Sequence, residues 1–474
     1  MKPRALISVI AIAVMTAITI PIVLAAQDAA VQGKKAQHHH YKLIDMGTFG
    51  GPQSYLNFYS QVLSPHGVVA GYSDTTAADP NFPNFGACFN PDCLFSHAFQ
   101  WQKGTVTDLG ALTNSAASAA FWISDNGLIV GESQNGLTDP ITGLAEVRAV
   151  LWQNGQIGDL GTLGGNESGA FAVNSYGQVV GAAGNPVSDP YSMFGLGTQT
   201  RAFLWQNGKM TDLGTLGGTD AFALGINEHG WVTGPSYSDS NPSANCPWPL
   251  TTHPFLVDAR GMRDLGTLGG SCAFPNVINK LGQVAGDSNL TGDTALHPFL
   301  WDGEKMIDLG SFGGTSGDAT FLNDAGVVVG SMNLQGDQMW HAFRWKDGKL
   351  HDLGTLDKCS TAWGINSKGQ IVGASGDCGV AVHAFLSEDG QMIDLTKLIP
   401  PHIELTYALS INDDGQIAAI GRVPGGGDVG IQHAFLLTPA DDNDAIELSD
   451  GNQDRTPVVE EPRQRGRFGA FMPR

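Results

Sequence analysis

The chain has 474 residues, of which 42% are hydrophobic, 15% are charged and 63 are glycine. This apolar content is enough for a packed core and excludes wholesale disorder. The formal net charge of −21 argues against a nucleic-acid partner and against adhesion to an anionic membrane.

The N-terminus predicts export. Lys2 and Arg4 precede an apolar run that ends in Ala25 and Ala26. A basic start, an apolar stretch and small terminal residues are typical of a signal peptide, so we expect residues 1–26 to be removed. The mature protein would be secreted, periplasmic or held at the cell surface, with no membrane span. The run is long enough to cross a bilayer, so an uncleaved anchor is the alternative.

After a predicted linker (27–40), three motifs recur in fixed order, eight times each. They are N-x-x-G-x-V-x-G, H-A-F-L-W and D-L-G, and the second returns at intervals of 42 to 53 residues. Residues 169–214 show four short apolar runs joined by turns, and Asn207-Gly208 between the last two suits a tight hairpin. Each repeat therefore predicts a four-stranded antiparallel sheet, apolar on both faces. Such sheets pack radially into a β-propeller.

The two ends of the repeat region predict how it closes. The segment "YKLIDMG" (41–47) has no preceding strands of its own, and the last repeat (405–439) has three strands and no fourth. The first strand can therefore complete the last sheet. We predict an all-β fold, an eight-bladed β-propeller over residues 41–439, followed by a disordered tail (440–474). A parallel β-helix is the rival fold, but it would not place tight Asn-Gly or Asp-Gly hairpins in most repeats.

These motifs, H-A-F-x-W, D-L-G-T-L-G-G and I-N-x-x-G-Q-V-V-G, resemble those of the HAF-repeat extracellular proteins of bacteria. The resemblance covers about residues 41–439. It implies an exported protein with propeller-like repeats and no particular activity. The sequence departs from the pattern at Arg148 and Arg201, which replace the leading histidine, and at Val257, which replaces the tryptophan.

The histidine and aspartate of each repeat lie at the same end of one predicted hairpin. Counting across the turn at Asp347-Gly348 places Asp352 opposite Phe343 and diagonal to His341. A hydrogen bond there would fix the edge of the sheet, and arginine could replace histidine as its donor. We therefore interpret these residues as structural: His97, His297, His341, His383, Asp108, Asp212, Asp308 and Asp352. A catalytic or metal-binding role is the alternative.

The repeats differ most in the loop between their second and third strands. These loops have 16 to 25 residues in repeats one to four and 9 to 11 in repeats five to eight. Because function is expected where the copies differ, we predict a ligand-binding face on the long loops. The candidate residues are Phe82, Phe85, Asp189, Tyr191, Phe194, Tyr237 and Trp248. Packing of these aromatic residues against the ring is the alternative.

The segment "DSNLTGD" (287–293) resembles the first half of a calcium loop. Its oxygen donors are Asp287, Asn289, Thr291 and Asp293, but Pro298 stands where the acidic twelfth ligand would be. A solvated turn is the simpler interpretation, so we expect no cofactor, with calcium as the one candidate.

Six cysteines in an exported chain indicate disulfides. The topology of the repeats predicts Cys88–Cys93, Cys246–Cys272 and Cys359–Cys378.

The sequence contains no G-x-S-x-G, H-E-x-x-H or phosphate-loop motif. We predict a monomeric, non-catalytic propeller that binds an extracellular glycan or protein. The alternative is a carbohydrate-active hydrolase or lyase with paired carboxylates roughly 5–10 Å apart at the mouth of the channel. A surface protein with a purely structural role is the third possibility.

Overall fold

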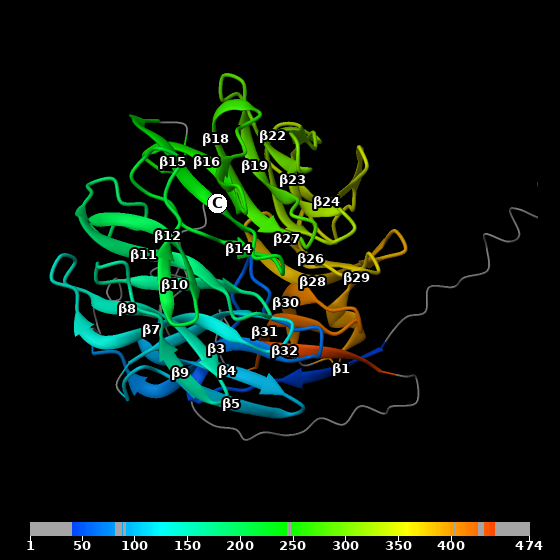
Figure 1. Cartoon of the computed structure of the whole chain (residues 1–474). Helices are drawn as coiled ribbons and strands as arrows, with labels where there is room; N and C mark the ends of the chain where they lie inside the picture. Colours follow the sequence, from blue (N-terminus) through cyan, green and yellow to red (C-terminus); the bar gives the residue numbers. More distant parts are fainter. Residues whose placement is uncertain are drawn as a thin grey trace, which may run out of the picture. The chain divides into compact units, whose positions relative to one another are not determined.

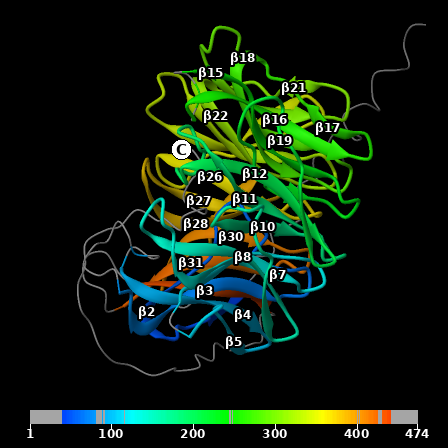
Figure 2. The same cartoon turned by 60° about the vertical axis from the view of Figure 1, so that its left-hand side comes forward.

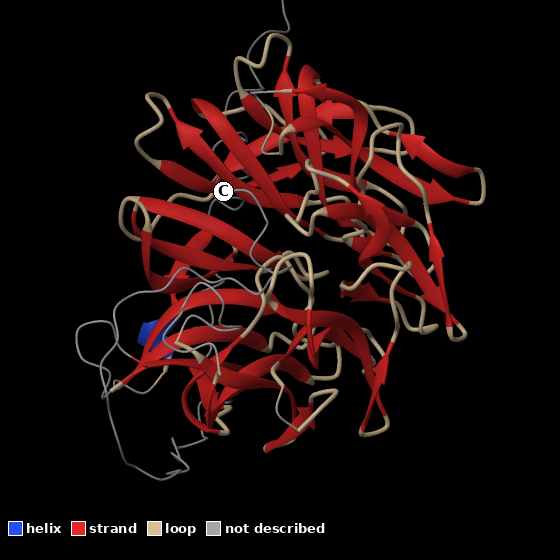
Figure 3. Ribbon diagram, turned by 90° about the vertical axis from the view of Figure 1, so that its left-hand side faces the viewer, coloured by secondary structure: helices blue, strands red, loops and turns tan. Residues whose placement is uncertain are grey.

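The structure is a computed structural model. It describes residues 40–440, except 81–87, 89–91, 115, 244, 245, 247, 400, 402 and 425–430. The predicted signal peptide, nearly all of the linker and the tail lie outside these residues. The regular structure of the described residues consists of strands and one short 3₁₀ helix, η1 (Leu395–Leu398) (Figure 3).

Within the described residues, the strands form eight antiparallel units of four, one for each sequence repeat. Repeats one to four consist of β2 (Gly50–Tyr55), β3 (Val69–Ala78), β4 (Leu94–Gln102) and β5 (Thr105–Gly110); β6 (Ser118–Ile123), β7 (Ile129–Thr138), β8 (Ala145–Gln153) and β9 (Gln156–Asp159); β10 (Ser168–Val173), β11 (Val179–Ser188), β12 (Thr198–Gln206) and β13 (Lys209–Asp212); and β14 (Gly225–Ile226), β15 (Val232–Pro242), β16 (Leu250–Asp258) and β17 (Gly261–Asp264).

Repeats five to seven consist of β18 (Gly269–Ile278), β19 (Val284–Leu290), β20 (Leu296–Trp301) and β21 (Met306–Asp308); β22 (Gly313–Leu322), β23 (Val328–Leu334), β24 (Trp340–Lys346) and β25 (Lys349–Asp352); and β26 (Cys359–Ile365), β27 (Ile371–Asp377), β28 (Val380–Glu388) and β29 (Gln391–Asp394). Repeat eight consists of β30 (Glu404–Ile411), β31 (Ile417–Val423), β32 (Ile431–Ala440) and the N-terminal β1 (His40–Asp45). A single parallel pairing, Leu296 with Ser316, joins the sheets of repeats five and six.

The N-terminal strand completes the last repeat, as predicted. Strand β1 pairs antiparallel with β32 from His40–Ala440 to Asp45–Phe435 (Figure 1). The amide of Met46 continues the ladder by donating to the carbonyl of Ala434 at 3.0 Å. Strands from the two ends of the described chain therefore share one sheet.

Two backbone features explain why each repeat folds as a meander. The predicted tight hairpins contain residues with positive φ, among them Asn207 (53°) and Asp347 (50°), and both residue types tolerate this region. The first strands of most repeats carry a β-bulge, for example between Ala170 and Ala172. The bulge brings the first strand close to the glycine of V-x-G on the second. A Cβ on Gly286 would overlap the carbonyl oxygen of Phe274, so the motif requires glycine there.

Apolar side chains fill the spaces between successive sheets, which follow one another in chain order (Figures 1 and 2). The phenylalanine of H-A-F is fully buried in seven repeats, and Val150 occupies that position in repeat two. Repeat eight packs on repeat one in the same way, because Leu409 and Leu436 share a cluster with Leu56 and Phe99. The described sheets thus have the propeller-like packing predicted for them.

Asparagine side chains link one repeat to the next. The amide of Asn279 donates to the carbonyl of Asn323 at 3.1 Å, and its oxygen accepts from the backbone amides of Leu281 and Gln283 within its own turn. The same bond between repeats is made by Asn174, Asn227, Asn323, Asn366 and Asn412. The bond from Asn412 reaches Ser64 of repeat one at 3.3 Å. The asparagine of I-N-x-x-G therefore shapes its own turn and joins it to the next repeat.

Replacement of Asn279 by alanine should lower the free energy of unfolding by about 1–3 kcal/mol, because buried backbone groups in two repeats lose their partner. Chemical denaturation of the variant would measure this. Gln338→Ala, at an exposed position, is the control and should leave stability unchanged within about 0.5 kcal/mol. Equal stability of the two variants would contradict this role.

Candidate functional site

The histidine and aspartate of most repeats form hydrogen bonds at the sheet edge. His341 Nδ1 lies 2.9 Å from Asp352 Oδ2, and Asp352 stands opposite Phe343 as counted from the sequence. Equivalent contacts join His97 to Asp108, His253 to Asp264, His297 to Asp308, and His433 to Asp45. His383 lies 3.2 Å from Asp394. In five of these pairs the aspartate also accepts a hydrogen bond from the amide of the glycine two residues later. The five are Asp45, Asp108, Asp264, Asp308 and Asp352. The pair therefore fixes the turn.

The two arginines that replace histidine behave differently. Arg201 Nε donates to Asp212 at 3.0 Å, whereas Arg148 bonds Glu146 at 3.4 Å. Burial alone would raise the pKa of the Asp108 carboxyl, but hydrogen bonds from His97 and the Gly110 amide hold that pKa below its usual value. These hydrogen bonds have the geometry expected for a structural role at the sheet edge.

The aromatic residues predicted for a binding face are mostly buried. Phe194, Tyr237 and Trp248 are 4%, 0% and 6% exposed and belong to one apolar cluster with Phe222 and Phe274. This burial agrees with the alternative prediction, that these aromatic residues pack against the ring, and does not support an exposed binding face formed by these three rings. The loops of repeats three and four are long enough to fold inward, where these rings exclude water.

The other four predicted ligand-binding residues differ in exposure or lie outside the described residues. Tyr191 is 45% exposed, and Asp189 is buried beside Asp220. Phe82 and Phe85 lie outside the described residues.

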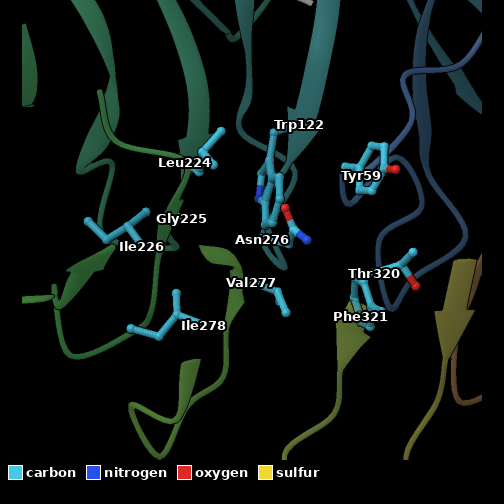
Figure 4. Close-up of a pocket in the computed structure, with 10 residues that line it drawn as sticks. All are labelled: Tyr59, Trp122, Leu224, Gly225, Ile226, Asn276, Val277, Ile278, Thr320 and Phe321. Atoms are coloured by element: carbon cyan, nitrogen blue, oxygen red, sulfur yellow. The ribbon is translucent and has the colours of Figure 1, made fainter. Parts of the chain in front are cut away.

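The inner strands enclose a small cavity of about 10 Å³, close to the lower limit for one buried water. Figure 4 shows side chains from several first strands converging on it, including Trp122, Leu224 and Asn276. Tyr59 also lines it, from the segment that follows β2. This segment holds four more residues between Ser54 and Ser64 than repeat three holds between Ser168 and Asn174. Because of this insertion, Tyr59 of repeat one reaches a residue of repeat six, Asp318.

Tyr59 reaches a pair of carboxyl groups. Its hydroxyl donates to Asp318 Oδ2 at 3.3 Å, and the Asp318 and Asp287 carboxyls are hydrogen-bonded to each other. Asn276 Nδ2 lies 2.9 Å from Asp318 Oδ1 and 3.2 Å from Asp287 Oδ1. Burial and then the neighbouring Asp318 raise the pKa of Asp287 well above its usual value, and burial raises that of Asp318. These raised pKa values favour a protonated carboxyl in the pair, and a protonated carboxyl can donate as well as accept hydrogen bonds.

Asp287 also lines an open groove of about 450 Å³. The groove lies between the loops of repeats four, five and six, and its polar and apolar walls suit a small molecule. Its lining residues are Cys246, Thr252, Cys272, Ala273, Phe274, Asp287, Asn289, Asp293, Thr294, Ala295, Leu296 and Thr315. Among the described residues, the lining side chains include carboxylates and no cationic group. The groove involves repeats four to six, whereas the predicted face was on repeats one to four.

Three of the four predicted calcium ligands, Asp287, Asn289 and Asp293, line this groove. Asp293, however, accepts from the amide and hydroxyl of Ser271 at 2.7 and 2.6 Å. Asp337 of repeat six makes the same two bonds to Thr315, so the "GD" turn is a repeated structural device. Within the described residues, no three acidic, histidine or cysteine side chains are grouped to hold a metal.

All three predicted cysteine pairs are disulfides in the structure. Cys246–Cys272 joins the long loop of repeat four to the first strand of repeat five, and both cysteines line the groove. The bond therefore holds one wall of the groove in place.

The sequence analysis missed Tyr59, Asn276 and Asp318. Asp287 was identified only as a calcium ligand. The signal for Tyr59 was the four-residue insertion after the first strand of repeat one. The signal for Asp318 was its charge, because other repeats have a small uncharged residue at the equivalent position of the first strand, such as Ala119 or Gly169.

Comparisons with known proteins show distant likeness only. No protein-family model matches the sequence, and no curated protein matches it. An ulvan lyase of family PL25, bound to a GlcA–Rha3S oligosaccharide, is 10% identical over 84% of this chain and 96% of its own, with a TM-score of 0.34. A Dyadobacter fermentans protein of unknown function is 11% identical over 85% and 99%, with a TM-score of 0.35. Scores this low carry no argument about function.

Among the described residues, no helix is long and apolar enough to cross a membrane.

Asp287→Asn should stabilise the protein by about 1 kcal/mol at pH 8 and by little at pH 4. Because the pKa of Asp287 is raised in the folded state, the native pair loses stability as pH rises above the usual carboxyl pKa, and asparagine cannot ionise. Denaturation at both pH values measures the effect. Asp389→Asn, in an exposed hairpin turn, is the control. A gain at pH 4 as large as that at pH 8 would contradict the raised pKa of Asp287.

Proposed function

We propose that the protein is an exported, non-catalytic, eight-bladed β-propeller of the HAF-repeat type that binds a glycan in the groove beside Asp287. Eight four-stranded units and the bond from Asn412 to Ser64 support the blade number and its closure. The basic-apolar N-terminus and three disulfides support export.

The groove is the observation that carries the binding proposal. Its volume of about 450 Å³ lies in the range of small-molecule sites and leaves room for one or two sugar rings. Asp287, the member of the carboxyl pair that lines the groove, offers a hydrogen-bonding group for sugar hydroxyls, and Thr252, Asn289 and Thr315 add further polar groups. Since carboxylates and no cation line the groove, a neutral or amine-bearing sugar fits better than a uronate or sulfated one.

The separation of the carboxyl groups favours binding over hydrolysis. Two-carboxylate glycosidases hold these groups about 5–9.5 Å apart, to leave room for the sugar and water. Asp287 and Asp318 are hydrogen-bonded to each other, which is closer than either geometry. A carbohydrate-active hydrolase or lyase is therefore the second candidate, favoured only by the raised pKa of Asp287.

The test is a glycan array and polysaccharide pull-down with residues 27–474, with calcium and with chelator, and with released sugars assayed in the same wells. We expect saturable binding of a neutral or amino-sugar glycan without released product. Ala295→Trp should fill the groove and weaken binding at least about tenfold. Met339→Trp, in the equivalent turn of repeat six, should leave binding unchanged.

Each other outcome has a defined meaning. Released product would replace the binding proposal with the enzyme. Equal loss in both tryptophan variants, or binding unaffected by either, would place the glycan elsewhere. Absence of binding to every glycan would leave a protein partner or a purely structural role.

A further inference from the structure

Residues 189–197 connect β11 to β12 and form a strap over buried aromatic side chains. The strap closes on itself through the Asp189 amide, which donates to the Gly197 carbonyl at 3.0 Å. Met193 and Phe194 are 3% and 4% exposed. The Phe194 ring lies 4.9 Å from Phe222, measured between ring centroids. The strap thus covers aromatic surface that would otherwise be exposed to solvent.

Asp220 and Tyr237, both outside the strap, hold it down through hydrogen bonds. The Met193 amide donates to Asp220 Oδ2 at 2.8 Å, and the Tyr237 hydroxyl donates to the Tyr191 carbonyl at 3.1 Å. Within the strap, Asp189 Oδ1 accepts from the Tyr191 amide at 2.8 Å. Asp189 and Asp220 therefore both bond strap backbone directly.

The same two carboxyl groups lie within reach of each other, and Asp189 Oδ2 and Asp220 Oδ1 are buried without a donor among the described residues. Asp189 is 3% exposed and Asp220 is 0% exposed. Among the described residues, the other titratable group shown to interact with both is Tyr237. The nearby Arg201 guanidinium is bonded to Asp212 and to the Thr219 carbonyl instead. Two buried carboxyls in contact, with no cation between them, stay together when one carries a proton.

We propose that the Asp189–Asp220 pair is a proton-operated latch, which keeps the strap closed while the pair shares a proton and releases it when both carboxyls ionise. Release uncovers the aromatic cluster beneath, including Phe222 and Trp248. Trp248 stacks on Phe274 at 4.9 Å, and Phe274 also lines the groove. The uncovered rings would therefore extend that groove with a surface suited to stacking on sugar rings. The latch itself does not rest on the proposed glycan binding.

The direction of the pH dependence follows from the buried acid. Burial, with a smaller contribution from Asp189, raises the pKa of Asp220 to about 8. The closed strap therefore binds more protons than the open one at neutral pH. The ratio of closed to open strap falls as pH rises, by up to about tenfold per pH unit, between the ordinary carboxyl pKa near 4 and the raised value.

Limited chymotrypsin digestion tests the latch, with cleavage after Tyr191 or Phe194 identified by mass spectrometry. Rates are divided by those of an unstructured peptide of residues 187–199 at each pH, which removes the pH dependence of the protease. The normalised rate at pH 8 should exceed that at pH 6 by at least about tenfold. It should return to its initial value on reacidification. Exposed aromatic surface would appear in parallel as binding of an apolar fluorescent dye.

Variants separate the latch from general unfolding. In Asp220→Asn the amide oxygen can still accept from Met193, but the group cannot ionise, so the normalised rate should stay at its pH 6 value. Asp189→Asn also removes one of the paired charges and replaces the first variant if that one does not fold. Asp357→Asn, at an exposed position outside the strap, should retain the rise.

A flat profile in the native protein would overturn the proposal. So would a rise of the same size in Asp220→Asn and Asp189→Asn, or cleavage that begins elsewhere in the chain with the same pH dependence.

Discussion

The hydrogen bond from one asparagine to the next repeat is the interaction on which the rest of the structure depends. Each asparagine oxygen accepts two amides of its own turn, while its nitrogen donates to a carbonyl of the following repeat. The turn that ends a first strand is thereby formed and docked by the same side chain. A first strand with a fixed end can bulge toward the interior, and the glycine opposite it accommodates that bulge. The polar motif thus specifies how sheets stack, which apolar burial alone would leave loose.

Because the repeats are so similar, the few positions at which one repeat differs from the others are candidates for function. At both carboxyl pairs an acidic side chain lies next to a bulged strand. Asp318 in repeat six stands where other repeats, such as two and three, have small residues, whereas Asp220 in repeat four has an acidic counterpart in repeat three, Glu167. Each meets a second acid from a neighbouring strand or loop. Two carboxyls in contact cost stability unless they share a proton, so neither pair serves the fold as the asparagines do. Both lie on the side where the longer loops gather. Function is therefore expected at these exceptions.

Much of the fold followed from the sequence because its signals are local. Asn-Gly and Asp-Gly hairpins, the order of the motifs and the incomplete last repeat predicted the four-stranded units and the pairing of β1 with β32. The cysteine pairs followed from the same topology. The site did not follow, because its contacts join distant repeats: Tyr59 and Asp318 are 259 residues apart. For aromatic residues in long loops, such as Trp248, the sequence left both an exposed binding face and packing against the ring open. Sequence pattern does not tell an exposed loop from one that folds back over the interior, and burial of large rings favours the second.

Hydrogen exchange in the presence of a bound glycan tests the central claim most directly, namely that ligand binds where the repeats differ. The structure predicts slower exchange of backbone amides in residues 287–296 and 313–318, which border the groove. The turns of the repeated asparagines should be unaffected. Protection centred on those turns, or on the histidine–aspartate edges shared by most repeats, would contradict the account. It would show that the repeated motifs themselves bind the ligand.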